Sequence, residues 1–241
     1  MYKRIIGMVL LDNGIFCRTR NFVPDYHYTN KFIDTRFFDE MAFIDVSAAG
    51  KGKSSEFCNG IAEIIQNSQL PVSLGGKIRS SDDVELYRTF GADRYIINQT
   101  EGSSDKLVAE LISSYGRSSI ISSINHWGPF TASRSSKHHL PLIDRIAEIA
   151  NNCGGDILLN SVERDGTLRG LDLDTIYQLA EIKNLSLIVS GGLGNMEHLY
   201  ESLHAPNVVG VCTSNVYHLT TNTISTWRAN LIARDLRLRK I

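Results

Sequence analysis

The sequence lacks any long hydrophobic run and any strong excess of charge of one sign. None of its apolar stretches approaches the roughly 18 residues that a membrane-spanning helix requires, so we expect no membrane association. The 26 Asp and Glu residues nearly balance the 25 Lys and Arg residues, which removes the electrostatic basis of general nucleic-acid binding. No linker or low-complexity tract interrupts the chain, so we expect one domain over residues 1–241.

Cysteine is also scarce, and its spacing fits neither a metal site nor a disulfide framework. The four cysteines are scattered along the chain at positions 17, 58, 153 and 212, so we expect free thiols and no metal ion. Nothing in the sequence indicates a cofactor. The opening segment MYKRIIGMVLL is too short for a signal peptide and has no small-residue cleavage site after it. We therefore expect a cytoplasmic protein.

Short apolar runs recur along the chain with helical patterns between most of them. Eight runs predict strands, at residues 4–11, 41–46, 71–74, 93–98, 119–124, 156–161, 186–190 and 208–213. The clearest helical patterns lie at 80–92, where Ser81 precedes two aspartates, and at 172–184; residues 130–140 are typical of a polar loop. Alternation of strands and helices predicts a parallel sheet covered by helices. Eight units in about 240 residues favour an α/β fold of the (β/α)₈ TIM-barrel type.

An internal repeat supports a barrel made of two halves. Gly75-Gly76 lies 116 residues before Gly191-Gly192, and Asn98 lies the same distance before Ser214. Each glycine pair ends a predicted strand and precedes a predicted helix. Backbone N–H groups at such a position favour a phosphate group. Because the repeat places both pairs on the same rim, we expect a ligand with a phosphate at each end.

The segment ERDGT, residues 163–167, follows the sixth predicted strand. Asp165 offers a hydrogen-bond acceptor for a polyol, or a base. Gly166 and Thr167 offer donors to a phosphate. An ordinary Asp-Gly turn explains the same letters, so both interpretations stay open at this point.

Several segments together match a known family. They are RII (4–6), FIDVSA (43–48), GGKIRS (75–80), GADRYIIN (91–98), LLNSVERDGT (158–167) and SGGLGN (190–195). The chain resembles the cyclase subunit of imidazole glycerol phosphate synthase, the HisF-type barrel of histidine biosynthesis, most weakly at 23–38 and 126–150. The resemblance implies a phosphorylated small-molecule ligand and a HisH-type glutaminase as partner. It also implies that ammonia made by the glutaminase enters at the N-terminal face of the barrel and crosses to the active site.

The resemblance places the family's two catalytic aspartates at substituted positions. The aspartate of the first strand aligns with Leu10, and that of the fifth strand aligns with Asn125. Neither residue can act as a carboxylate acid or base, and loss of one such group typically lowers a rate about 10²–10⁴-fold. Asp12 lies two residues beyond Leu10, on the same strand face if the strand continues, and is the candidate substitute.

The phosphate sites that the resemblance implies are altered as well. Lys77 stands where the family has a third glycine, and Asn215 stands where it has a serine. We therefore expect one phosphate group to bind securely, in the second half, and the first-half site to be changed. The expected phosphate-binding residues are Gly75, Gly76, Lys77, Asn98, Asp165, Gly166, Thr167, Gly191, Gly192, Ser214 and Asn215.

The resemblance also implies a ring of alternating charges where ammonia enters the barrel. Its positions carry Arg4, Glu40, Arg94 and Asp156, each with the sign that the family has there. Strand alternation puts Arg4 and Leu10 on one face, and six residues at about 3.3 Å each separate them by about 20 Å. We therefore expect the charges at one mouth of the barrel and the substituted acid positions at the other.

Three functions remain open. In the first, the chain is a HisF-like subunit that docks a glutaminase and conducts ammonia for amidination of a sugar-type acceptor. LLNS (158–161) resembles a paralogous branch that works beside sugar amidotransferases in bacterial surface-polysaccharide synthesis. In the second, it is a working cyclase, a lyase, of histidine biosynthesis. In the third, it is a non-catalytic phosphosugar-binding barrel or an unrelated isomerase. Whether the chain is itself an enzyme stays open.

Overall fold

A closed ring of parallel strands forms the centre of the molecule. The computed structural model describes residues 2–29, 35–48, 54–100, 104–132, 139–153, 155–214 and 223–239. The strands of the ring, in spatial order, are β1 (Arg4–Asp12), β4 (Glu40–Asp45), β5 (Val72–Gly75), β6 (Arg94–Asn98), β7 (Ile120–Trp127), β9 (Asp156–Ser161), β10 (Ser186–Ser190) and β11 (Val208–Thr213). Because β11 pairs in parallel with β1, the sheet closes. The predicted (β/α)₈ TIM barrel is confirmed, and each predicted strand overlaps one of these.

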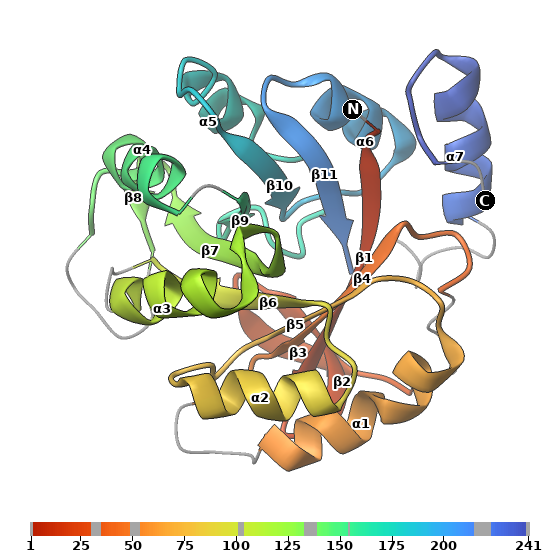
Figure 1. Cartoon of the computed structure of the whole chain (residues 1–241). Helices are drawn as coiled ribbons and strands as arrows, with labels where there is room; N and C mark the ends of the chain where they lie inside the picture. The colour runs from red at the N-terminus through yellow and green to blue at the C-terminus, as the bar shows by residue number, and fades with distance from the viewer. Residues whose placement is uncertain are drawn as a thin grey trace.

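Helices surround the barrel, as Figure 1 shows. They are α1 (Ser54–Asn67), α2 (Ser81–Thr89), α3 (Asp105–Tyr115), α4 (Leu142–Asn152), α5 (Leu173–Gln178), α6 (Met196–His204) and α7 (Thr223–Ala233), with a 3₁₀ turn at Arg117–Ser119. None of the helices in the described part of the chain is long and apolar enough to cross a membrane.

Two helix boundaries differ from the sequence prediction for identifiable reasons. Helix α2 is capped by Ser80 and not by Ser81, because Ser80 and Asp83 form a reciprocal capping box. Helix α5 ends at Gln178, well short of the predicted residue 184. The side chain of Asn207 hydrogen-bonds the carbonyl oxygens of Leu179 and Ala180, so they do not continue the helical pattern.

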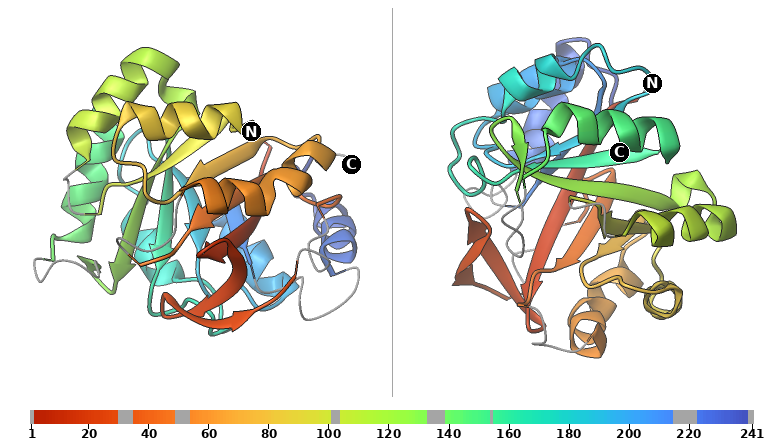
Figure 2. Two further views of the ribbon diagram at one scale, coloured as in Figure 1. Left: turned by 90° about the horizontal axis from the view of Figure 1, so that it is seen from below. Right: turned by 90° about the vertical axis from the view of Figure 1, so that its left-hand side faces the viewer.

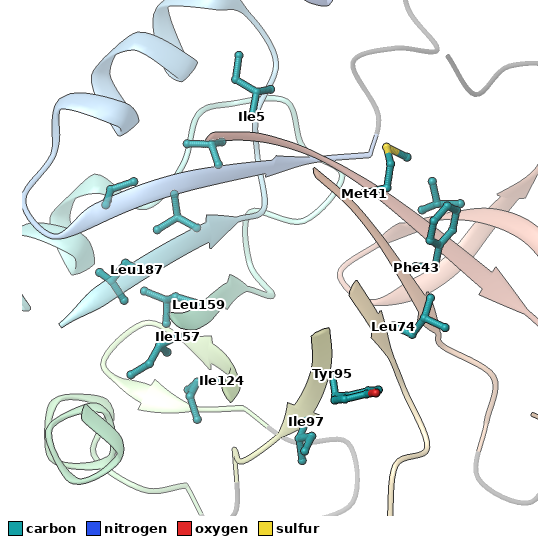
Figure 3. Close-up of a cluster of buried hydrophobic side chains, with 14 of the residues drawn as sticks. Ile5, Met41, Phe43, Leu74, Tyr95, Ile97, Ile124, Ile157, Leu159 and Leu187 are labelled. Carbon is teal, nitrogen blue, oxygen red and sulfur yellow. The ribbon is translucent and has the colours of Figure 1, made fainter. Parts of the chain in front are cut away.

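The strands alternate between two separate hydrophobic cores. Outward-facing residues such as Ile5, Phe43 and Leu159 pack against the helices, and Figure 3 labels ten members of this layer. Inward-facing residues form a second cluster, made of Ile6, Met8, Leu10, Cys17, Ala42, Ile96, Ile121, Leu158, Ile188 and Cys212. The inner cluster fills the barrel interior between its two mouths.

Two short hairpins extend the barrel beyond its C-terminal rim, and neither was predicted. Strands β2 (Ile15–Arg20) and β3 (Val23–His27) fold back along β1, and Figure 2 shows this hairpin at the end of the molecule away from the N-terminus. The turn into β2 uses Asn13 and Gly14, both at positive φ, as Asn-Gly hairpins require. Strand β8 (Phe130–Thr131) pairs with β7 inside the segment predicted as a polar loop; residues 133–138 lie outside the described residues.

Candidate functional site

A cavity of about 890 Å³ opens at the C-terminal end of the barrel. Its floor includes Met8, Leu10 and Ile96 from the inner cluster, and its rim is formed by loops and by the two hairpins. This is the end at which TIM barrels bind their ligands. The volume lies in the range of small-molecule sites, about 300–1,000 Å³.

The two positions that the resemblance assigns to catalytic acids meet in this cavity. Leu10, at the end of β1, and Asn125, near the end of β7, both line it. Leu10 is 7% exposed and packs with the inner cluster. Asp12 is not among the described residues that line the cavity, because β1 turns into the hairpin there and Asp12 pairs with Ile15. The structure therefore does not bring the candidate substitute to the site.

An amide pair that sequence reasoning missed lies at the cavity wall. Asn160 Nδ2 donates to Asn125 Oδ1 at 3.0 Å and to Ser123 Oγ at 3.0 Å. Asn160 and Asn125 are directly opposite each other in the β7–β9 register. The two residues are 35 positions apart in the sequence, so no local pattern indicates the contact. Parallel pairing of the two predicted strands is the signal that could have predicted it.

Lys77 forms an ion pair inside the cavity. Its Nζ lies 3.1 Å from Asp45 Oδ2, and the Asp45 side chain is only 2% exposed. Asp45 Oδ1 also accepts hydrogen bonds from the backbone and hydroxyl of Ser47. Lys77 adopts φ of +56°, a conformation that favours glycine. The lysine therefore keeps the backbone shape of the glycine that the resemblance implies, while Asp45 neutralises its charge.

The two glycine pairs lie where strands end and loops pass closely. A Cβ at Gly76, whose φ is +89°, would come within 2.2 Å of the Asp45 carbonyl oxygen. A Cβ at Gly192 would meet the Gly170 carbonyl oxygen at the same distance. Gly76, Gly191 and Gly192 line the cavity, whereas Gly75 packs against Ile96 and does not. Close backbone packing is thus a sufficient reason for glycine here, beside any ligand.

Asp165 fixes the first hairpin. Its Oδ2 accepts hydrogen bonds from Thr19 Oγ1 at 2.7 Å and from Phe22 N at 2.9 Å. Gly166 lines the cavity next to it, whereas Thr167 does not, since its hydroxyl donates to the Arg164 carbonyl oxygen. The ERDGT segment therefore also has a structural role, because it holds the β2–β3 hairpin, which lines the cavity, in place.

The other expected phosphate-binding residues divide between the cavity and the undescribed part of the chain. Asn98 and Ser214 line the cavity, and Asn215 lies outside the described residues. Thr213, also in the lining, is 4% exposed. Its hydroxyl oxygen is buried and has no hydrogen-bond partner among the described residues.

Aromatic side chains form part of the cavity wall that the sequence did not predict. Trp127 and Phe130 are cross-strand partners on β7 and β8, and Phe22 lies at the tip of the β2–β3 hairpin. All three line the cavity. The signal that could have predicted this hairpin is Gly128-Pro129, a two-residue turn between Trp127 and Phe130.

A closed ring of four charges lies at the opposite mouth. Arg4 contacts Glu40 at 2.8 Å and Asp156 at 2.7 Å, while Arg94 contacts the same two carboxylates at 3.4 and 2.6 Å. All four side chains are at most 22% exposed. Each residue lies at the start of its strand, so the structure brings the four residues of the expected charged ring together.

The electrostatic balance of this ring depends on mutual pairing. Burial alone would raise the pKa of the Asp156 carboxyl, but the charges of Arg4 and Arg94 outweigh it and hold that pKa below its ordinary value. Ser186 Oγ adds a hydrogen bond to Asp156 Oδ1 at 2.6 Å. The Asp156 carboxylate is therefore ionised at neutral pH.

The cysteines are free, as predicted. Cys17, Cys58 and Cys212 are buried, and burial raises the pKa of the Cys17 thiol to about 12 and that of Cys58 to about 11. Such thiols are poor nucleophiles at neutral pH. Within the described ranges, no group of three His, Cys, Asp or Glu residues could hold a metal ion.

Comparison with known proteins relates the chain to one family. A family model described as "Histidine biosynthesis protein" matches residues 7–223. The chain is 26% identical to the imidazole glycerol phosphate synthase subunit HisF of Buchnera aphidicola, over 99% of this chain and 98% of that protein. It is 28% identical to the HisF subunit of Saccharolobus solfataricus, over 90% of each chain. It is also 28% identical to that of Escherichia coli, over 83% of this chain and 82% of the relative.

Proposed function

Since this chain belongs to the histidine biosynthesis protein family, we propose that it is a HisF-like subunit that docks a HisH-type glutaminase and conducts ammonia. The ammonia leaves at the C-terminal cavity and serves the amidination of a sugar-type acceptor. A sugar amidotransferase is the expected third component. The relatives are named as subunits of imidazole glycerol phosphate synthase, which supports a barrel that works within a complex.

The single observation that carries the proposal is the contrast between the two mouths of the barrel. At the N-terminal mouth, Arg4, Glu40, Arg94 and Asp156 form a complete ring of four ion pairs. At the C-terminal mouth, the positions that the resemblance assigns to acids carry Leu10 and Asn125. The N-terminal mouth keeps all four charges, and the C-terminal mouth lacks the two acids at these positions. This combination fits delivery of ammonia better than the cyclase reaction.

The barrel interior supports passage of a neutral nucleophile. Ile6, Ala42, Leu158 and Ile188 belong to the inner cluster but do not line the cavity, so an apolar layer separates the cavity from the charged ring. Transfer of an ammonium ion into such a layer is costly, because the ion loses its water. Neutral ammonia does not carry that cost, so the layer selects for it.

The cyclase of histidine biosynthesis is the second candidate, and the position of one residue favours it. Asp45 contributes a carboxylate to the cavity wall, although not from the strands that the resemblance implies. Its ion pair with Lys77 and its two Ser47 hydrogen bonds occupy it. A paired carboxylate that is 2% exposed is a weak candidate for the general acid or base.

The test is stimulation of the cognate glutaminase. Addition of this protein should raise the rate of glutamine hydrolysis, and Arg4→Ala or Glu40→Ala should uncouple hydrolysis from product amidination. Arg234→Ala is the matched control, because Arg234 makes an exposed ion pair with Glu197. No stimulation with the correct partner would overturn the proposal; unchanged coupling in both ring variants would show that the ring is purely structural.

A further inference from the structure

An arginine lies on the core-facing side of helix α7. Arg228 falls between Ile224 and Leu231, about one helical turn from each, and all three residues are at most 5% exposed. A guanidinium group at such a position has lost most of its water, so it must be paired. An apolar side chain would serve packing alone, and the contacts of Arg228 therefore identify its role.

The partner of Arg228 is Asp39, the residue before strand β4. Arg228 Nη1 donates to Asp39 Oδ2 at 2.7 Å, and Arg228 Nη2 donates to Asp39 Oδ1 at 3.1 Å. Both side chains are 6% exposed. Two parallel hydrogen bonds between a guanidinium and a carboxylate fix the direction of the carboxylate as well as its distance. Arg228 therefore determines where the Asp39 side chain points.

Asp39 joins the starts of two barrel strands that carry members of the charged ring. Its N–H group donates to the Ile5 carbonyl oxygen at 2.9 Å, and its Oδ2 accepts from Ile5 N at 2.8 Å. Ile5 follows Arg4, and Asp39 precedes Glu40. The parallel register of β1 and β4 begins at Ile6 and Glu40. The Asp39 contacts thus hold the backbone just outside that register, beside the ion pair of Arg4 with Glu40.

The segment after α7 is fixed to the same mouth of the barrel. Lys3 N donates to the Arg237 carbonyl oxygen at 2.8 Å, and Lys3 forms a parallel bridge with Leu238. Arg228 Nη2 also donates to the Arg239 carbonyl oxygen at 2.5 Å. One guanidinium group therefore links α7, the C-terminal segment and the starts of β1 and β4.

We propose that Arg228 and Asp39 are positioning residues for the charged ring. Arg228 orients the Asp39 carboxylate, and Asp39 holds the backbone next to Arg4 and Glu40 where their ion pair forms. Both lie outside the ring, and neither is among the described residues that line the cavity. The importance of this pair for ammonia entry rests on the proposed function, whereas its effect on the ring is measured on the barrel alone.

The first test measures the pKa of Asp156, which Arg4 contacts at 2.7 Å. The double variant Asp39→Ala/Arg228→Met removes both partners together, so neither charge is left buried alone and the net charge is unchanged. Carbon-13 NMR of the Asp156 carboxyl should show its pKa raised by about one unit, because an arginine this close lowers such a pKa by about 1–3 units. A pair that only anchors α7 would leave that pKa unchanged.

Two further variants separate geometry from charge. In Asp39→Ala, loss of a negative charge alone would lower the Asp156 pKa further, whereas release of Arg4 raises it, and we expect the rise. Glu197→Ala/Arg234→Met is the matched control, because it removes an exposed arginine–carboxylate pair that links α6 to the end of α7. It should leave the Asp156 pKa at the wild-type value.

The second test uses the complex with the cognate glutaminase. In the double variant Asp39→Ala/Arg228→Met, a larger fraction of the ammonia made from glutamine should escape into solution, whereas product formation from added ammonium chloride should not change. An unchanged Asp156 pKa in the folded double variant would overturn the inference. So would unchanged ammonia escape from a complex that is coupled in the wild type. A wild-type complex without coupling would instead overturn the proposed function, and the Asp156 measurement would still decide whether the pair positions the ring.

Discussion

Asn160 Nδ2 donates a hydrogen bond to Asn125 Oδ1 across the β7–β9 pair, at 3.0 Å. Because the Asn125 carbonyl oxygen is used in this contact, its Nδ2 amino group is the part left for the cavity. The position that the family resemblance assigns to a catalytic acid therefore presents a hydrogen-bond donor. A donor suits an acceptor atom of a bound ligand, and it cannot remove a proton.

The first prediction introduces carboxylates at both positions that the resemblance assigns to catalytic acids. Wild-type protein should fail to complement a histidine auxotroph, whereas the double variant Leu10→Asp/Asn125→Asp should restore measurable growth. Asn125→Asp keeps an acceptor for Asn160 Nδ2 and should change stability little. Leu10→Asp places a carboxylate at a position that is 7% exposed, so it should lower the free energy of unfolding by about 2–4 kcal/mol.

Complementation by the wild type would favour the cyclase candidate instead. The single variants are the controls, because general acid and general base must both be present for the full rate. A double variant that is folded by circular dichroism but gives no growth would show that the cavity lacks more than the two acids.

The second prediction concerns the pH dependence of the charged ring. The pKa of Asp156 is lowered in the folded protein, so its ionised form stabilises the fold above the unfolded pKa of about 3.9. That contribution is lost as pH falls through the folded value. Asp156→Asn should therefore lower the free energy of unfolding by about 2–4 kcal/mol at neutral pH, because it leaves two partly buried arginines short of charge.

Urea unfolding at several pH values measures this difference. The gap between wild type and Asp156→Asn should begin to narrow below about pH 4, where the carboxyl of the unfolded chain takes up a proton, and it should close once pH falls below the lowered pKa of the folded protein. Glu197→Gln, in an exposed ion pair with Arg234, is the control and should show no comparable loss. A gap that stays constant with pH would mean that Asp156 stabilises the ring through hydrogen bonds alone.

The barrel was predictable because its strands are short apolar runs of regular spacing. The four positions of the charged ring came from the family resemblance; strand parity and strand length added only that Arg4 and Leu10 lie at opposite mouths. The Asp45–Lys77 pair was not, because it depends on how a side chain turns after its strand ends. The position of Trp127 was not predictable for a similar reason. Strand β7 continues into a hairpin, and the sequence has no alternating apolar pattern over that extension.

The sequence also leaves the roles of individual residues undetermined. Asn13-Gly14 is the strongest short-range hairpin signal, yet the strand that follows this turn was not predicted. Asp165 lines the cavity, so a ligand contact stays a prediction; its Oδ2 also holds Thr19 and Phe22, which are far from it in sequence. Polar residues after a strand can serve a ligand or a neighbouring loop, and only the three-dimensional arrangement separates the two.

The third prediction concerns the ion pair in the cavity. Lys77→Met leaves the Asp45 carboxylate, 2% exposed, with Ser47 as its remaining assigned contact, and should cost about 3 kcal/mol. Asp45→Asn should cost less, since Lys77 is the more exposed partner at 17%. A double-mutant cycle by urea unfolding should give a coupling of about 1–3 kcal/mol. Additive losses would mean that the two side chains do not stabilise each other.

The fourth prediction separates backbone strain from steric collision at the glycine corner. Gly76 and Gly116 both have positive φ values, +89° and +84°, so an alanine is strained at either position. At Gly116, where ψ is 156°, the backbone lies in a region that is essentially confined to glycine. A Cβ at Gly116 would have no atom within 4 Å, whereas one at Gly76 would lie 2.2 Å from the Asp45 carbonyl oxygen. Gly116→Ala should therefore show only a strain cost in urea unfolding. Gly76→Ala adds a collision with the backbone and should lose more stability, because β4 or the loop after β5 must move. Equal losses in the two variants would show that the loop after β5 yields freely, and that the tight packing of this corner does not hold the cavity in shape.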